Sequence, residues 1–345
     1  DSIFRPISST ITMDNSLFGS FLTDEISSNI NDNVNIHLEI VDIEGGNVTH
    51  HPAGEYHDVL GPLTFSHNTI TTDFLATGWQ LLAPPLSGVQ YFPETHIHDC
   101  SEITTDEACS QIAGGTISGS GSGFYLENFG AAIDSYSFYG SVLAEETIPL
   151  QEGWNLVGNP LVTPFDVNKL IITHFNEEYK WNEAAKAGII APTPIIYDND
   201  IASHVGTDVL QTAAGFWMQS YHDNVEISFI PASSAPEPAY SPYWNMSIFA
   251  KEANPEVYFD EAIGSEIVIG IHEDAKDYFV VGEDQKIFPL SNMNIFSHYT
   301  EISVNNGGDA IYKDMRSYHD PVVTWSISVE SNNPTVNDNI KIYWN

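Results

Sequence analysis

The chain has 345 residues, 42% of them hydrophobic, and a mean hydropathy of −0.14, so it can bury cores for two to four domains. It carries 47 acidic residues against ten Lys and Arg, a formal net charge of −37, which argues against nucleic acid or an anionic membrane as a partner. No apolar run approaches the roughly 18–20 residues that span a bilayer, so we expect no membrane insertion. Three explanations of the acidity stay open: solubility in a salty medium, Ca²⁺ binding, and a cationic partner.

Residues 1–72 form a β-rich N-terminal region, in which residues 34–41 alternate between apolar and polar side chains as a strand does. A Gly- and Pro-rich stretch follows that strand, and imidazoles and carboxylates together are ligands for Zn or Cu. No third ligand at a recognised spacing supports such a site. The residues concerned are His50, His51, Glu55, His57 and Asp58.

An internal repeat organises the middle of the chain. Residues 77–86 align with residues 152–161 through a shared Gly-Trp-x-Leu pattern followed by Pro, and each copy is followed by a glycine-aromatic strand at 121–126 or 214–218. In a strand, Trp and Leu at this spacing point to one face. We therefore predict core roles for the tryptophans and for the aromatic strand, with an exposed sugar-binding platform as the alternative. The residues are Trp79, Trp154, Phe216 and Trp217.

The two cysteines, Cys100 and Cys109, enclose one short acidic loop and predict a disulfide, which requires an oxidising compartment. Just before them, His96 and His98 lie at strand spacing on one face, a weak transition-metal signal for which solvated loop histidines are the preferred explanation.

A second metal candidate is calcium. Asp198, Asn199 and Asp200, with Asp208 nearby, offer oxygen ligands in a turn-rich segment. The EF-hand spacing is missing, and Asp and Asn are also common turn residues.

Strand patterns dominate the whole chain and one short helix is indicated over residues 175–187. The predicted class is all-β, with tandem β-sandwich modules, Ig-like or jelly-roll-like, and very little helix. Near the end, Asp314 and Arg316 are expected to form a structural charge pair close to Trp325. The strand patterns lie at 225–230, 266–271, 323–329 and 340–344.

The second repeat resembles a known module. Its run Gly-Trp-Asn-Leu-Val-Gly-Asn-Pro at 153–160 is similar to the "GWNLIGNP" repeats of large secreted surface proteins of Bacteroidetes and neighbouring phyla. The segment after 312 also resembles the β-sandwich that often follows such repeats. The resemblance covers about residues 70–345, although the first copy has Ala83-Pro84 where the motif has Gly-Asn. It implies an extracellular location and architectural roles, and it implies no active site.

The resulting domain prediction has five parts: an N-terminal region, two repeat modules, a Pro-rich linker and a C-terminal β-sandwich. Their bounds are 1–72, 73–146, 147–233, 234–242 and 243–345.

Catalytic signatures are missing: there is no G-x-S-x-G, no H-E-x-x-H, no phosphate-binding loop and no dinucleotide-binding turn. We therefore expect no enzyme, and no cofactor other than Ca²⁺. The preferred function is a secreted structural or adhesive protein of the cell surface, such as the subunit of an extracellular filament or sheath. Its partners would be further copies of itself or other surface proteins.

The alternative function is a glycan-binding module, or an accessory part of a polysaccharide-degrading enzyme. Seven Trp and 16 Tyr motivate it, because aromatic faces stack on sugars. The two functions differ in whether five tryptophans are buried or form an exposed row: Trp79, Trp154, Trp181, Trp217 and Trp244.

Overall fold

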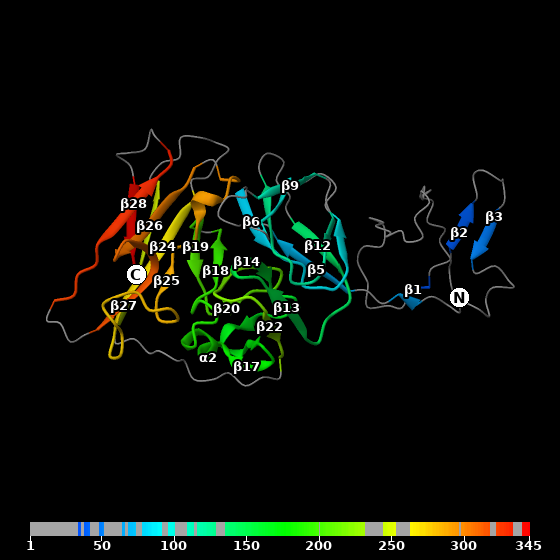
Figure 1. Cartoon of the computed structure of the whole chain (residues 1–345). Helices are drawn as coiled ribbons and strands as arrows, with labels where there is room; N and C mark the ends of the chain where they lie inside the picture. Colours follow the sequence, from blue (N-terminus) through cyan, green and yellow to red (C-terminus); the bar gives the residue numbers. More distant parts are fainter. Residues whose placement is uncertain are drawn as a thin grey trace. The chain divides into compact units, whose positions relative to one another are not determined.

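A computed structural model gives the architecture of the chain (Figure 1). Between residues 34 and 73 it describes the backbone of short strands. It also describes residues 78–91, 96–100, 109–113, 116–128, 135–199, 201–231, 244–252, 263–296, 298–317, 322–333 and 340–345. Some predicted residues lie outside these ranges: Glu55, His57, Asp58, Asp200 and the linker 234–242.

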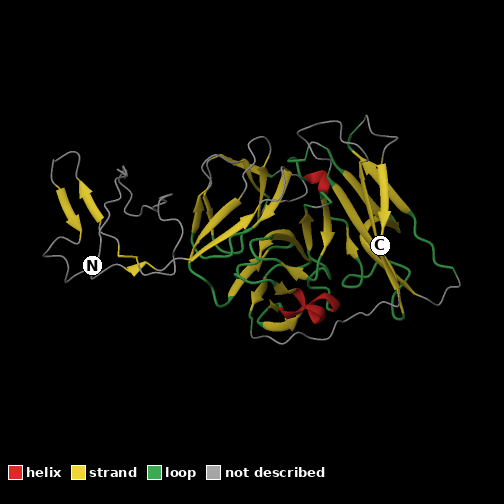
Figure 2. Ribbon diagram, turned by 180° about the vertical axis from the view of Figure 1, so that it is seen from behind, coloured by secondary structure: helices red, strands yellow, loops and turns green. Residues whose placement is uncertain are grey.

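The protein is all-β, as predicted, and Figure 2 shows that strands outnumber helices throughout the described residues. The chain divides into two compact units, residues 1–66 and 67–345. In the first unit, β1 (Val34–Asn35) pairs with β4 (Thr64–Phe65), and β2 (Leu38–Val41) pairs with β3 (Val48–His51).

The first repeat lies at the start of the second unit. Its main sheet has the order β6-β11-β8-β9, and smaller pairs join β10 with β7 and β12 with β5. Its core includes Leu82, Ile97, Phe124 and Phe138, all buried. The strands are β5 (Asn68–Asp73), β6 (Gly78–Leu82), β7 (Val89–Tyr91), β8 (His96–Asp99), β9 (Ser110–Ala113), β10 (Thr116–Ser118), β11 (Phe124–Asn128) and β12 (Ser135–Gly140).

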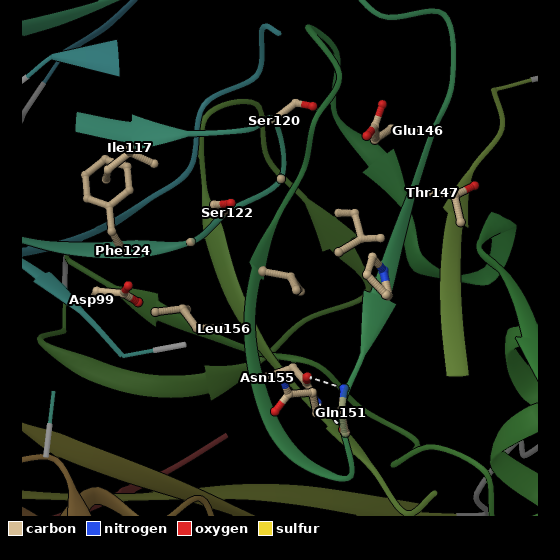
Figure 3. A pocket seen from close by; sticks show the side chains of 15 residues that line it. Asp99, Ile117, Ser120, Ser122, Phe124, Glu146, Thr147, Gln151, Asn155 and Leu156 are labelled. Carbon is tan, nitrogen blue, oxygen red and sulfur yellow. Dashed lines mark hydrogen bonds between the residues drawn. The ribbon is translucent and has the colours of Figure 1, made fainter. Parts of the chain in front are cut away.

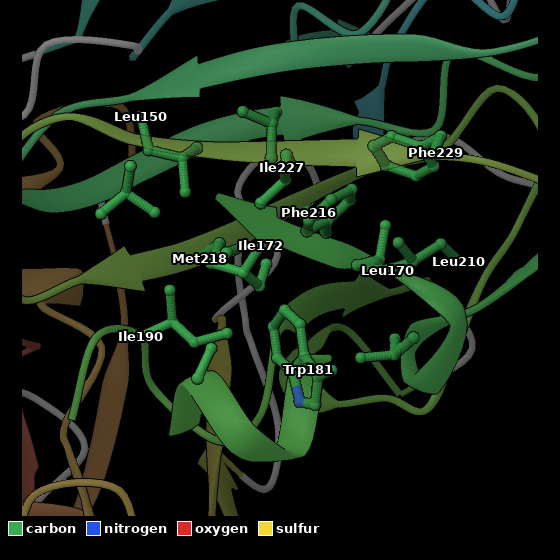
Figure 4. Packing of buried hydrophobic residues seen from close by; sticks show 14 of the residues in the cluster. Leu150, Leu170, Ile172, Trp181, Ile190, Leu210, Phe216, Met218, Ile227 and Phe229 are labelled. Carbon is green, nitrogen blue, oxygen red and sulfur yellow. The ribbon is translucent and has the colours of Figure 1, made fainter. Parts of the chain in front are cut away.

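The second repeat forms a four-stranded sheet, β13-β22-β16-β17, and one end of a larger sheet, β14-β21-β18-β19. The helix α2 (Trp181–Lys186) covers its core with Trp181 (Figure 4). The other elements are β13 (Glu146–Leu150), β14 (Gly153–Gly158), β15 (Phe165–Asp166), the 3₁₀ turn Val167–Lys169, β16 (Ile171–His174), β17 (Glu177–Lys180), β18 (Ile195–Asp198), β19 (Ser203–Gly206), β20 (Val209–Leu210), β21 (Gly215–Ser220) and β22 (Val225–Phe229).

The helix is shorter than the sequence predicts, because its first part is a β-hairpin. Phe175 and Asn176 adopt positive φ angles of 48° and 66°. Two successive residues of this kind make the tight turn that matches the twist of a hairpin, so the chain returns as β17 along β16. The helix then begins at Trp181, where the Glu183 carboxylate accepts a hydrogen bond from the Lys180 backbone N–H at 3.0 Å.

The remaining strands belong to the segment after the linker. Parallel pairing of β19 with β24 joins this segment to the second repeat in one 11-stranded sheet. Its own core is aliphatic, with Ile248, Ile267, Ile302 and Ile311 buried. The elements are β23 (Trp244–Glu252), β24 (Gly264–His272), β25 (Gln285–Lys286), the 3₁₀ turn Leu290–Asn292, β26 (Thr300–Asn306), β27 (Asp309–Ser317), β28 (Ile327–Ser331) and β29 (Ile340–Trp344).

The two repeats pair their strands in the same register. In the first, Trp79 lies opposite Glu127; in the second, Trp154 lies opposite Gln219. The same alignment makes Tyr125 of the first repeat equivalent to Trp217 of the second. The sequence repeat is therefore a structural repeat.

The equivalent strands of the two repeats also meet each other. Leu82 forms an antiparallel bridge with Ala214, and Val157, the residue equivalent to Leu82, forms one with Ser122. Because Ser122 is equivalent to Ala214, the two bridges are related by an approximate twofold axis. The hydrogen bonds obey the same relation: Ala83 N donates to Ala213 O at 3.0 Å and Gly158 N donates to Gly121 O at 2.9 Å. We call this contact the repeat seam.

Candidate functional site

The tryptophans do not form an exposed row. Trp79, Trp181 and Trp217 are buried, Trp154 is half-buried, and Trp244 is 44% exposed. Trp79 packs edge-to-face on His98 and Phe296, each with its ring centroid 5.2 Å away. Trp154 has Phe288 as its aromatic neighbour at the same distance. The two equivalent tryptophans thus pack against the same aromatic core but differ in burial.

Cys100 and Cys109 form the predicted disulfide. Cys100 is buried and, with its half-buried partner, belongs to the aromatic core that contains Trp79 and Trp217. The bond ties the ends of one loop to this core. It supports an oxidising environment.

Those predicted metal ligands whose side chains the structure describes do not come together. His98 is nearly buried, with Nε2 3.4 Å from the Glu127 carboxylate, while the side chain of His96 is not described. Asp198 ends β18 and Asp208 follows the far end of β19. The Asn199 side chain donates a hydrogen bond to Gln80. Within the described ranges, no three His, Cys, Asp or Glu side chains gather as ligands of an ion.

Two asparagines of the repeat motif hold the backbone together. The Asn155 amide donates to Gln151 O at 2.8 Å and accepts from Gln151 N at 2.8 Å. Asn159 is fully buried, donates to Thr163 O at 2.8 Å and Leu210 O at 3.1 Å, and accepts from Leu161 N at 3.0 Å. These two motif residues therefore shape turns.

A buried polar chain crosses the repeat seam. The Trp217 indole N–H donates to Tyr125 Oη at 2.8 Å, and Tyr125 Oη is 2.7 Å from His204 Nε2. Burial lowers the pKa of His204 to about 3 and raises that of Tyr125 well above its usual value. His204 is therefore neutral at physiological pH, and we assign Nε2 as the acceptor of the Tyr125 hydroxyl. Sequence reasoning identified Tyr125 and Trp217 as equivalent aromatics but missed His204, which no repeat marks.

The predicted charge pair near Trp325 is present. Arg316 Nε donates to the buried Asp314 carboxylate at 2.8 Å, and the Arg316 guanidinium lies 5.6 Å from the Trp325 ring centroid. Asp314 also accepts from the Asn306 amide at 2.8 Å.

One pocket opens beside the repeat seam, with a volume of about 420 Å³. The turn before β11 contributes Ser120 and Ser122, and β13 contributes Glu146 and Thr147 (Figure 3). Asp99, next to the disulfide, adds a second carboxylate. Hydroxyls and carboxylates around an opening of this size suit a small polar ligand.

A second hollow lies in the C-terminal segment and is lined almost wholly by apolar side chains, with a volume of about 390 Å³. We call it the apolar groove. It lies between β28 and β29, each of which pairs with only one strand among the described residues. Its lining residues are Met246, Ile248, Ile302, Ile327, Val329, Ile342 and Trp344. Trp344 is 69% exposed and Ile342 is 48% exposed.

No family model, curated protein or solved structure matches this chain. In the described part of the chain, no helix is long and apolar enough to span a membrane.

Proposed function

We propose that the protein is a secreted structural or adhesive protein of a cell surface that works by association. The apolar groove is the observation that carries this proposal. Monomeric proteins seldom leave large apolar side chains gathered between two unpaired strand edges, because such surfaces attract other chains. The partners are further copies of the chain or other surface proteins.

The distribution of buried polar groups favours the same conclusion. The His204, Tyr125 and Trp217 chain is enclosed, and Asp314 is held by Arg316 and Asn306. The polar atoms of these side chains form hydrogen bonds that join separate segments of the chain. The disulfide supports extracellular use.

Sedimentation velocity of the full chain over a wide concentration range tests this proposal. Reversible association, together with retention of the protein on the surface of the cells that produce it, is the expected result. A chain that stays monomeric and does not bind that surface would contradict it.

A second candidate function, glycan binding, is favoured by the pocket beside the repeat seam. Its carboxylates and hydroxyls provide hydrogen-bond partners for sugar hydroxyls. Titration with a panel of neutral and amino-sugar polysaccharides tests this function. Glu146→Gln should weaken binding, whereas Glu178→Gln, an exposed change on β17 outside the pocket, should not. Equal affinity of both variants would remove the pocket from consideration.

A further inference from the structure

We infer that β29 is a dimerisation strand, which pairs antiparallel with β29 of a second copy about a twofold axis at Ile342. This inference rests on the proposed function and names the partner and the contact. Its evidence is the orientation of the backbone, the distribution of charge, the register that the side chains allow, and the position of the apolar groove.

The free edge of β29 presents backbone groups at alternate residues. Asn345 N donates to Ser247 O at 3.1 Å, so Asn345, and with it Tyr343 and Lys341, turns its backbone groups toward β23. Ile340, Ile342 and Trp344 therefore direct their N–H and C=O groups away from β23. This edge can accept a further strand without disturbing the pairing inside the molecule.

Charge favours this edge over the edges formed by β28, β13 and β17. In a chain with a net charge of −37, two copies repel each other wherever carboxylates face. The strand β29 has no carboxylate and carries Lys341. By contrast, β28 carries Glu330, β13 carries Glu146, and β17 carries Glu177 and Glu178.

The side chains then select one register. With Ile342 opposite its own copy, Ile340 lies opposite Trp344 and Lys341 lies opposite Tyr343. Aromatic pairs with β-branched residues are favourable across antiparallel strands. A shift that places Lys341 opposite its own copy brings two ammonium groups together. The opposite shift, with Tyr343 opposite its own copy, pairs Ile342 with Trp344 but moves Lys341 from the ring of Tyr343 to Asn345, so the contact between Lys341 and an aromatic ring is lost.

The added strand would also cover the apolar groove. Directly opposite residues in an antiparallel pair project their side chains to the same face of the sheet. Because Ile342 and Trp344 line the groove, the Ile342 and Trp344 side chains of the second copy would extend the same face toward Ile327 and Val329 of β28. Because the pairing is twofold symmetric, each copy covers the apolar groove of the other, and one contact closes both grooves. A small apolar ligand could fill a groove but would leave the backbone edge of β29 unpaired.

Ile342→Pro tests the backbone contact directly. Proline removes the outward N–H and places its ring on the free edge, while the pairing with β23 uses Lys341, Tyr343 and Asn345. We expect dimerisation measured by sedimentation to weaken by about a hundredfold or more, since both bonds of the central pair are lost. Ile342→Val, the matched control, should dimerise nearly as the unmodified chain does.

A cross-link provides the second test, which stands even if the proline variant misfolds. Both cysteines of the chain are in the disulfide, so Ile342→Cys would add a single free thiol. Under mild oxidation it should yield a disulfide-linked dimer, whereas Val322→Cys, at a position 76% exposed and off β29, should not. A well-folded Ile342→Pro variant that associates like the unmodified chain would overturn the inference and leave the proposed function standing, as would equal cross-linking at both sites. An unmodified chain that stays monomeric and does not bind the surface of the producing cells would contradict both.

Discussion

The repeat seam predicts a compensating pair of substitutions. Gly158 and Ala83 occupy equivalent positions and face each other across the approximate twofold axis. A Cβ added to Gly158 would lie 1.8 Å from the Ala83 Cβ. Such an overlap forces the two backbones apart, and overpacking of this kind typically costs about 1–3 kcal/mol. Gly158→Ala should therefore destabilise the second unit by about that amount.

Exchanging the two residues should recover most of the loss. In the double variant Ala83→Gly and Gly158→Ala, one methyl group again occupies the axis, so the coupling energy should approach the cost of the overlap. The free energy of unfolding is measured by urea titration, with an unchanged denaturant slope as the check on comparability. Ala83→Gly alone is the control and should cost only about 1 kcal/mol or less, from added backbone entropy. A double variant as unstable as Gly158→Ala alone would refute the face-to-face arrangement.

Three further predictions concern buried or half-buried side chains and can be tested by the same titrations. Tyr125→Phe should lower the free energy of unfolding by about 2–4 kcal/mol, because it leaves a buried donor and a buried acceptor unpaired. The control is Tyr179→Phe, which removes a hydroxyl that contacts an exposed carboxylate and should change stability by about 0.5 kcal/mol or less. Trp79→Ala should lower the free energy of unfolding by about 3–5 kcal/mol. Trp154→Ala should lower it clearly less, since Trp154 is only half-buried. Equal losses of stability would contradict the burial argument. Desolvation, reinforced by a neighbouring carboxylate, raises the pKa of Glu301 to about 7. The folded chain therefore holds this proton more tightly than the unfolded chain. The resulting stabilisation is complete below pH about 4.5 and is lost as the pH rises through about 7. The stability of Glu301→Gln relative to the unmodified chain should therefore increase across that interval.

Much of the fold follows from patterns in the sequence. Period-two alternation locates β24 and β29, and the repeated Gly-Trp-x-Leu locates β6 and β14, because these signals arise from local side-chain periodicity. The seam between the repeats could not be predicted, since it depends on which faces of two finished modules fit together. The sequence does contain one sign of it. Ala83 departs from the glycine of the repeat motif at the position where only one of the two facing residues has room for a methyl group.

The candidate sites were less predictable than the fold. Cys100 and Cys109 pair because only a short loop separates them, a constraint visible in the sequence. The apolar groove is formed by residues from four strands, which no local pattern brings together. The neighbours of His98 were hidden from the sequence for a related reason. His98 has the spacing of a ligand, but its neighbours in space are Trp79 and Glu127.

The excess of carboxylates is compatible with this fold because neutral donors replace the missing cations. Glu266 is buried and accepts from Gly206 N at 2.9 Å and from the Tyr312 hydroxyl at 2.8 Å, so it joins β24 to β19 and β27. Asp284 is fully buried and accepts from two backbone N–H groups, at 2.8 and 2.9 Å. Desolvation nevertheless raises the pKa of Asp284 to about 7. Asp284 is thus only partly charged near neutral pH. The protein's carboxylates serve partly as internal hydrogen-bond acceptors, and a surface that meets another copy, as we propose for β29, is best formed by a strand without them.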